Sequence, residues 1–532
     1  MRSPLAALPV FADVVLVAVV SCSSERPPVE TLYPTDAGTN GVDSGPTVVL
    51  NVNQAQPDPK TCAEAADAHS YVGCDYWPTV LANVVWSYFD FAVVVSNVSD
   101  VAATVTVTGP SSTNRTLTID PGTIQKIVLP WVPNLKGADS SGGGSMTASV
   151  LEKGGAYHLV SSVPVVAYQF SALEYHRQYA GPAVQESADS CTEGTSECYS
   201  FTNDASLLLP STAWTGSYRV SSIPGEEDAN GSYIAIVASQ AGTTVTTSLT
   251  LAGAILGGAG VAQTAGGGKL ILTLGAGDVA ELVTPIGSAY DLSGALVTAD
   301  KPVEVFTGNP CRSIPSGKPA CDHVEESVLP AESLGSEYIV TTPTKPAGGV
   351  GAHVVRFFGN RDGTTLRYYP KKPGACPDTL NAGQVVDCGS MIGNDFIVQG
   401  SAEFAISSFT ASAQVYGTDP LGDPDQTSFA SAEQFRTRYV FLAPVDYDIN
   451  YAVIAGSKDA APVIDGLALA GYREISSGYG VWRTELGRTT ESHVLTSTLP
   501  VGLQVMGYGA YTSYTYPGGL SLALIAPPPS VK

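Results

Sequence analysis

A segment that recurs four times along the chain places the strongest constraint on its fold. Residues 156–172 (AYHLVSSVPVVAYQFSA) predict a β-strand, a bend that contains proline, and a second strand that pairs back on the first. Variants follow as DLSGALVTADKPVEVFTG at 291–308, FIVQGSAEFAISSFT at 396–410 and HVLTSTLPVGLQVMGYG at 493–509. A unit that repeats within one chain indicates a repeat architecture.

The spacing of these segments predicts the size of each unit. The bends at Pro302, Ala402 and Pro500 lie roughly 100 residues apart, and about seven short apolar runs per interval are typical of an immunoglobulin-like β-sandwich. A propeller blade needs only about 40–50 residues. We therefore expect an all-β chain of about four tandem immunoglobulin-like β-sandwich units. The main alternative is one larger pseudo-symmetric assembly.

The same pattern gives the expected domain boundaries. They are a signal peptide at 1–21, a disordered tether at 22–60, a first sandwich at 61–172, an insertion and second sandwich at 173–311, a third at 312–413 and a fourth at 414–532. The tether is rich in Pro, Ser, Thr, Asp and Gly and has almost no aromatic residues, so we expect it to stay flexible.

The first residues have the features of an export signal. Arg2 precedes an apolar run at 14–20, which is too short to span a bilayer because a spanning helix needs about 20 apolar residues. The run ends in VVSC, which resembles the bacterial lipobox. That resemblance implies acylation of Cys22 and anchoring at the outer membrane or cell surface of a Gram-negative bacterium. The alternative is an ordinary signal peptide with an incidental cysteine.

The other cysteines fall into neighbouring couples, and an even number of them in an exported chain favours disulfides. The couples are Cys62–Cys74, Cys191–Cys198, Cys311–Cys321 and Cys376–Cys388. Pairing of neighbours costs the least chain entropy, although eight cysteines permit 105 pairings. The couples contain no CxxC motif and no histidine at ligand spacing, so they do not favour zinc.

Charge limits the classes of partner. Only 14% of the residues are charged and the net charge is −23. Nucleic acid is not an expected partner, because its phosphates are bound by Lys and Arg. An acidic chain is also repelled by anionic lipid surfaces, so we expect membrane contact through the lipid anchor alone.

The sequence contains no motif that favours an enzyme or a cofactor. The six histidines are scattered, without HExxH or GxSxG. His158 and His493 occupy corresponding places in two closing segments and could mark matched sites. We favour a strand residue hydrogen-bonded at a turn, because Asp291 and Phe396 stand near these places in the other two units.

An acidic stretch is the one candidate metal site. Asp419, Asp423 and Asp425 lie within TDPLGDPDQT, and Ca²⁺ requires six to eight oxygen ligands. The stretch lacks the EF-hand pattern and its two prolines suit a linker between units. We therefore expect no metal.

A dense run of tyrosines is the candidate ligand-contact surface. Tyr508, Tyr511, Tyr514 and Tyr516 could stack on sugars or anchor a protein interface. Tyr508, Tyr514 and Tyr516 also share parity, so they could lie on one inward face of a strand. The inward arrangement is favoured.

Four stretches resemble a known family. They are YVGCDYWPTVLANVVWSYFDFAVVV at 71–95, LVSSVPVVAYQFSALE at 159–174, FTNDASLLLP at 201–210 with TAWTGSYRV at 212–220, and GYGAYTSYTYPGGL at 507–520. They resemble the bacterial form of the IgGFc-binding protein N-terminal domain. The resemblance implies an extracellular, non-catalytic binding or adhesive module, without implying that this chain binds IgG.

The leading hypothesis is a cell-surface lipoprotein that recognises an extracellular protein or glycan. The first alternative is a structural envelope spacer without a specific ligand. The second is an extracellular hydrolase whose site is assembled between units.

Overall fold

The structure of the chain is a computed structural model that describes residues 47–52, 57–139, 146–177, 190–191, 198–226, 230–318, 320–415 and 421–530. The chain divides into Met1–Pro46 and a compact unit, Thr47–Lys532, which holds all of the described residues. That unit is built almost entirely of antiparallel strands. The predicted all-β class with sandwich-like repeats is therefore confirmed.

Each repeat is built from two groups of strands, which one long closing strand joins in the first, second and fourth repeats. In the first repeat the outer sheet contains β4 (Thr113–Ile119), β3 (Ala103–Gly109), the first half of β7 (His158–Ser171) and β1 (Gly73–Tyr76). The second sheet contains β5 (Ile124–Leu129), β2 (Phe91–Asn97), the second half of β7 and β11 (Asp204–Leu207).

The same plan recurs three times. The second repeat contains β12 (Thr215–Arg219), β13 (Tyr233–Ala238), β14 (Thr243–Ser248), β15 (Lys269–Leu274), β16 (Val279–Val283), β17 (Leu296–Arg312) and β18 (Asp322–Ser327). The third contains β19 (Glu337–Val340), β20 (His353–Gly359), β21 (Thr364–Tyr369), β22 (Thr379–Leu380), β23 (Val385–Asp387), β24 (Phe396–Gly400), β25 (Phe404–Thr410) and β26 (Gln426–Ser428). The fourth contains β27 (Arg436–Leu442), β28 (Ile449–Ser457), β29 (Val463–Ile464), β30 (Leu467–Ala468), β31 (Arg473–Ser476), β32 (Tyr479–Leu486), β33 (Ser492–Gly509) and β34 (Thr512–Pro517).

The remaining elements are short. They are the helices α1 (Cys62–Ala68) and α2 (Pro133–Lys136), the strand β6 (Val150–Glu152), which pairs with β16, and a small sheet of β8 (His176–Arg177), β9 (Ser190–Cys191) and β10 (Cys198–Tyr199). The 3-10 turns are η1 (Pro110–Ser112), η2 (Ser211–Ala213), η3 (Ala331–Ser333), η4 (Ala413–Val415), η5 (Ala432–Gln434) and η6 (Lys458–Ala460). No described helix has the length and apolar character needed to cross a bilayer.

The predicted hairpin in the closing segments is wrong. β7 runs as a single strand through Pro164, and its two halves pair with different strands instead of with each other. In the third repeat the strand is divided into β24 and β25, which belong to separate four-stranded sheets. Proline has no N–H to donate to a ladder. The bend is therefore a suitable place for a strand to change partners.

A tyrosine holds this bend in every repeat. Its hydroxyl donates to the carbonyl of the residue that follows the bend. The pairs are Tyr76 with Val165, Tyr218 with Val303, Tyr338 with Phe404 and Tyr439 with Val501. The shared hydrogen bond shows that the four repeats are built alike in detail.

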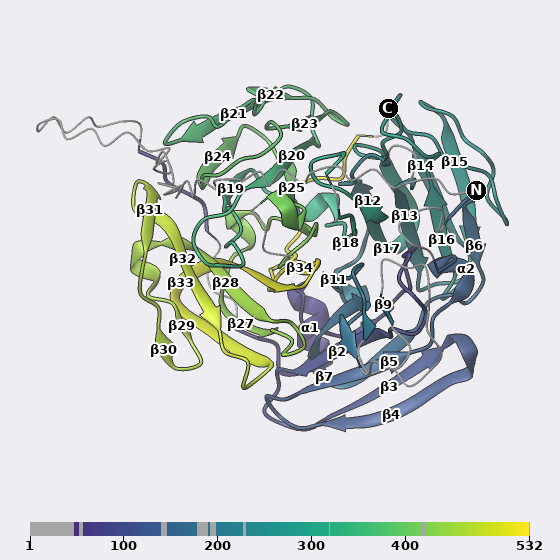
Figure 1. Cartoon of the computed structure of the whole chain (residues 1–532), viewed down its shortest axis with the longest axis horizontal. Coiled ribbons are helices and arrows are strands. Elements are labelled where there is room, and N and C mark those ends of the chain that lie inside the picture. The colour runs from purple at the N-terminus through teal and green to yellow at the C-terminus, as the bar shows by residue number, and fades with distance from the viewer. Residues whose placement is uncertain are drawn as a thin grey trace, which may run out of the picture. The chain divides into compact units, whose positions relative to one another are not determined.

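Four inner strands join the repeats into one body (Figure 1). β11 contacts β18 and β34, and β26 contacts the same two strands, so the contacts form a closed ring. Strands of the outer sheets alternate between buried and exposed residues, as in β15, whereas β2 and β13 are buried throughout. The second sheet is thus covered on both faces at its central strand. The repeats are sandwich-like, and they also form the single assembly that the sequence left open.

Because of the inner strands, the repeats end at other residues than the sequence predicted. Boundaries predicted after residues 172, 311 and 413 separate each closing strand from the inner strand that pairs with it. A repeat defined by strand pairing therefore ends after its inner strand.

Part of the predicted tether is packed against the folded body. Val48 and Leu50 are only 2% and 4% exposed, and Asp58 forms ion pairs with Arg436 and Arg438. A flexible tether as far as residue 60 does not hold for residues 47–52 and 57–60, because these residues have apolar and charged partners in later repeats. Cys22 lies outside the described residues.

Three predicted disulfides are present. They are Cys62–Cys74, Cys311–Cys321 and Cys376–Cys388. Cys198 lies opposite Cys191 in the pairing of β10 with β9. The side chain of Cys191 lies outside the described residues, so this fourth couple stays a prediction.

Candidate functional site

The first and fourth repeats meet where the chain closes on itself. The Tyr71 N–H donates to the Leu520 carbonyl at 3.2 Å, and the Leu522 N–H donates to the His69 carbonyl at 2.8 Å. The chain on either side of this contact belongs to the beginning of the first repeat and to the end of the fourth. We call this junction the closure seam.

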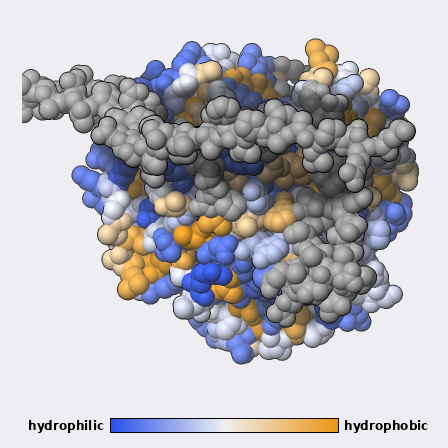
Figure 2. Space-filling view, viewed as in Figure 1, coloured by the Kyte–Doolittle hydropathy of each residue, from blue (hydrophilic) through white to orange (hydrophobic). Residues whose placement is uncertain are grey.

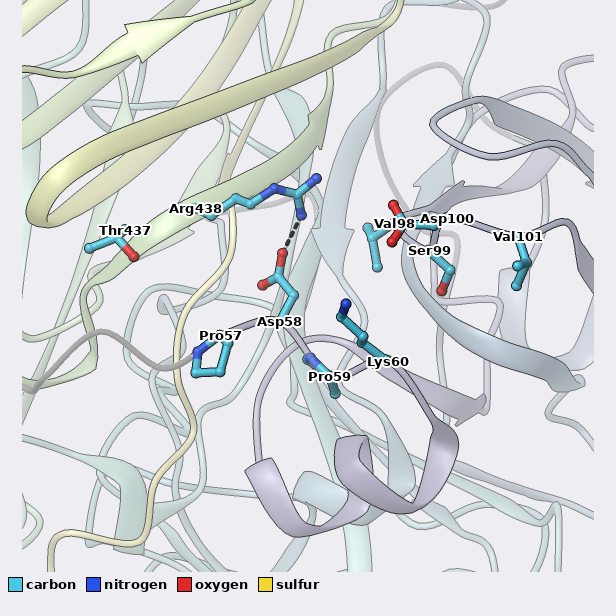
Figure 3. A pocket seen from close by; sticks show the side chains of 10 residues that line it. All are labelled: Pro57, Asp58, Pro59, Lys60, Val98, Ser99, Asp100, Val101, Thr437 and Arg438. Atoms are coloured by element: carbon cyan, nitrogen blue, oxygen red, sulfur yellow. Dashed lines mark hydrogen bonds and ion pairs between the residues drawn. The ribbon is translucent and has the colours of Figure 1, made fainter.

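A cavity of about 540 Å³ lies beside the closure seam (Figure 3). Its lining comes from three stretches that are far apart in the sequence. They are Pro57, Asp58, Pro59 and Lys60; Val98, Ser99, Asp100 and Val101; and Thr437 with Arg438. We call this cavity the seam pocket.

Strand β27 supplies the charged wall of the pocket. Arg436 and Arg438 are separated by one residue and both bind the carboxylate of Asp58, with 2.6 Å between Arg436 Nη2 and Asp58 Oδ1. Arg436 is 3% exposed and lies over the ring of Tyr71, whereas Arg438 is 40% exposed at the pocket. The paired arginines fix residues 57–60 as the floor of the site.

The loop between β2 and β3 supplies the opposite wall. The Asn97 side chain donates to the carbonyls of Val101 and Ile119 at 2.8 and 2.9 Å and accepts from the Ser99 N–H at 3.0 Å. Ser99 Oγ donates to the carbonyl of Pro164, at the bend of β7. The loop is therefore held in one conformation before any ligand arrives, which lowers the entropic cost of binding.

The pocket offers groups without partners. Among the described residues, neither the ammonium group of Lys60 nor the carboxylate of Asp100 has a hydrogen-bond or ion-pair partner. Figure 3 shows Lys60 pointing into the space between Asp58 and the loop that carries Asp100. Val101 is 57% exposed beside them. A cation, an anion and an apolar side chain at one cavity can recognise a partner surface of matching chemistry.

The lining of the pocket does not favour a reaction. Among the described residues that line the cavity there is no histidine or cysteine, and the hydroxyl of Ser99 donates to a backbone carbonyl. A nucleophilic mechanism requires a base within hydrogen-bond reach of the nucleophile. The fixed walls and the exposed Lys60, Asp100 and Val101 are suited to binding.

The tyrosine run is mainly part of the core. Tyr508, Tyr514 and Tyr516 are at most 1% exposed. The hydroxyl of Tyr508 donates to the carbonyl of Thr344 at 2.6 Å, and that of Tyr514 donates to Asn450 Oδ1 at 2.8 Å. Only Tyr511 reaches the surface, at 36% exposed. The structure thus shows the inward arrangement for three of the four residues.

The two matched histidines each bind an aspartate. His158 Nε2 lies 2.8 Å from Asp75 Oδ2, and His493 Nδ1 lies 2.6 Å from Asp465 Oδ2. The hydroxyl of Ser211 donates to Asp75 and not to the histidine, so these three groups do not form a nucleophile–base pair.

Two of the calcium candidates are buried among other acidic side chains. Asp423 and Asp425 are fully buried, and Asp419 lies outside the described residues. Asp425 accepts from the hydroxyls of Thr410 and Ser513 at 2.7 and 2.9 Å, and burial raises its pKa to about 6. No group of three or more potential metal ligands occurs within the described residues.

The seam pocket could not be predicted from local sequence patterns. Residues 57–60 belong to the predicted tether, and no motif marks residues 98–101. The available signal was Arg436 and Arg438 at alternate positions of one strand, in a chain of which only 14% is charged. Their partner Asp58 is 378 residues from Arg436 in the sequence, so no local pattern connects them.

Comparisons with known proteins agree with the resemblance in the sequence. A family model described as IgGFc binding protein matches residues 204–507, more than half of the 532 residues. The IgGFc-binding protein of Homo sapiens is 36% identical over 141 residues, which is 26% of this chain and 2% of that protein. The chain therefore spans a small part of that relative's length. No solved structure matches the chain. The matched residues run from β11 into β33, through the second, third and fourth repeats, and the chain belongs to the IgGFc binding protein family.

Proposed function

We propose that this chain is a non-catalytic protein of the cell exterior that binds an extracellular protein through the seam pocket. The observation that carries the proposal is the pocket itself, in which Lys60, Asp100 and Val101 face solvent on walls that are already fixed. Membership of the IgGFc binding protein family supports a protein as the partner. The name of the human relative makes the Fc fragment of IgG the first partner to test.

The molecular surface in Figure 2 has a mixed character that suits a reversible contact. On the face in Figure 2, hydrophobic residues occur in small groups among hydrophilic ones. Interfaces that form between independently folded proteins have this mixed character. Affinity would then come from a few residues in the pocket, as is usual for such interfaces.

The test is a binding measurement on the full chain with matched variants. Lys60→Glu and Val101→Asp change the pocket, while Lys371→Glu and Leu251→Asp introduce the same acidic side chains at exposed positions in other repeats. Surface plasmon resonance against Fc and a panel of extracellular proteins is expected to show at least about tenfold weaker binding for the pocket variants alone. Equal binding by all variants would place the contact elsewhere. Absence of any partner would favour the structural spacer.

We also propose that the chain is exported and held at the outer membrane or cell surface by acylation of Cys22. The support is the VVSC sequence that ends the apolar run. Metabolic labelling with a fatty acid is expected to mark the wild type but not Cys22→Ser. Equal labelling of both would contradict the anchor.

A further inference from the structure

A short segment near the first described residue lies across the junction of the third and fourth repeats. Residues 48–51, which we call the strap, alternate in exposure: Val48 and Leu50 are 2% and 4% exposed, whereas Val49 is 71% exposed. In Figure 1 this purple segment lies beside β24 and β31. The strap belongs to no helix or sheet, and its alternation of buried and exposed side chains is that of an extended chain.

The buried side chains of the strap enter an apolar seat. The seat consists of Ile339, Tyr369 and Ile397 of the third repeat and Ala432, Phe435 and Ala455 of the fourth, with Ile475 and Tyr479 at its edge. Since both repeats contribute, the seat is complete only where they meet. Its shape accommodates apolar side chains at alternate positions of an extended peptide.

Among the described residues, the hydrogen-bond partners of the strap are all side chains. The Val48 N–H donates to Ser477 Oγ at 3.0 Å, and the Leu50 N–H donates to Tyr479 Oη at 3.3 Å. Gln399 Nε2 donates to the Val49 carbonyl at 3.0 Å. Side chains of the seat therefore form hydrogen bonds with backbone groups on both edges of the strap.

One carboxylate forms hydrogen bonds with the last residue of the strap. Glu337 accepts from both the N–H and the side-chain amide of Asn51, the latter at 3.1 Å. Gln399 donates to the same carboxylate at 3.0 Å and keeps it oriented. The seat thus prefers a side chain that donates a hydrogen bond at the fourth position.

We propose that the seat is a recognition site for an extended segment of a partner protein, with apolar residues at its first and third positions and a side-chain donor at its fourth. The strap occupies this site as an intramolecular competitor. The free energy gained by burying Val48 and Leu50 is offset by the conformational entropy lost when the segment is ordered. The strap can therefore exchange with a peptide from another protein. The inference rests on the proposed function, because it supplies that protein-binding role with a second site and a sequence preference.

The experiment uses the full chain with the strap released. Val48→Asp/Leu50→Asp removes the two apolar contacts, and Val49→Asp/Val52→Asp is the matched control at exposed positions. The probe is a fluorescent peptide TVVLNV, the sequence of residues 47–52, followed by fluorescence anisotropy. The released variant is expected to bind it saturably and at least about tenfold more tightly than the wild type or the control, because a tethered strap competes at high effective concentration.

Two further measurements address specificity. A peptide with Asp in place of its first two buried residues is expected not to bind. A random peptide library selected on the released variant is expected to yield apolar–x–apolar–donor sequences, and Glu337→Gln is expected to relax the preference at the fourth position. If the double aspartate variant does not fold by circular dichroism, Val48→Ala/Leu50→Ala replaces it, with an intermediate gain.

Several outcomes would overturn the proposal. They are absence of peptide binding by a folded released variant, a selected library without the alternating pattern, or self-association of the wild type that the released variant lacks. The last would show that the seat takes the strap of a second copy. None of these outcomes depends on the pocket variants Lys60→Glu and Val101→Asp, so failure here is separate from failure of the proposed function.

Discussion

At the scale of single residues, buried carboxyl groups are the most unusual feature of the chain. Asp204, on β11, accepts from the N–H groups of Glu325 and Gln426 on two other inner strands. Glu326 in the same way accepts from the Ser428 N–H at 3.2 Å. Within the described part of the chain, the inner edges of these strands have no ladder partner. Acidic side chains accept hydrogen bonds from these N–H groups instead. This role accounts for the burial of several carboxyl groups among the inner strands.

Burial of these groups predicts a specific pH dependence. Desolvation raises the pKa of Asp423 and that of Asp322 well above their usual range. The folded chain therefore keeps protons at pH values where the unfolded chain has lost them. The contribution of such groups to the free energy of unfolding is largest below about pH 4 and falls as the pH rises toward the folded pKa.

Asp423→Asn tests this dependence. Asp423 Oδ1 accepts from the Ala413 N–H, and Oδ2 has no partner among the described residues, so asparagine can keep the existing bond. Relative to the wild type, we expect little change in the free energy of unfolding at pH 4 and a gain of about 1 kcal/mol or more at pH 8. Urea denaturation at both pH values measures it, with the exposed Asp120→Asn as the control. A loss at pH 8 would contradict the expectation.

At the scale of the element, the closing strand is shaped by its bend and by the tyrosine that holds it. In the second repeat the hydroxyl of Tyr218 donates to the Val303 carbonyl and accepts from the Thr215 N–H at 3.1 Å. Both partners are thereby satisfied at the point where β17 changes sheets. The element depends on this bond because the bend leaves backbone groups outside both ladders.

Tyr218→Phe is therefore expected to destabilise the chain by about 1–3 kcal/mol, because it leaves the partners of a buried hydroxyl unsatisfied. The free energy of unfolding in urea is the measurement. Tyr290→Phe, at a residue 36% exposed, is the matched control and should change little. An unchanged free energy of unfolding for Tyr218→Phe would mean that the bend does not depend on the hydrogen bonds of the Tyr218 hydroxyl.

At the scale of the whole molecule, the ring of inner strands joins the repeats into one cooperative body. Asp204 of the first repeat is bonded to the second and third, and Thr512 of the fourth donates to Asn203 of the first at 3.2 Å. Removal of one repeat would expose buried polar groups in its neighbours. We therefore expect a single transition in scanning calorimetry, with equal calorimetric and van't Hoff enthalpies. Separate transitions would indicate independent repeats.

The closure seam should share in this cooperativity. Leu520 is 1% exposed, and its carbonyl accepts from the Tyr71 N–H. Leu520→Ala is expected to cost about 2–5 kcal/mol through the cavity that it leaves. The midpoint of the whole transition should fall, whereas Leu524→Ala, at a residue 54% exposed, should leave it in place. A new early transition after Leu520→Ala would show that the seam opens alone.

The sequence by itself determined the features that depend on nearby residues. Strand segments, the recurring bend and the neighbouring cysteine couples follow from local patterning and short loops, so the all-β repeat class could be predicted. The tertiary structure decided which strands pair at each bend, because a strand does not specify its partner. It also decided how the inner strands close and how Asp58 meets Arg436, since these contacts join residues hundreds of positions apart.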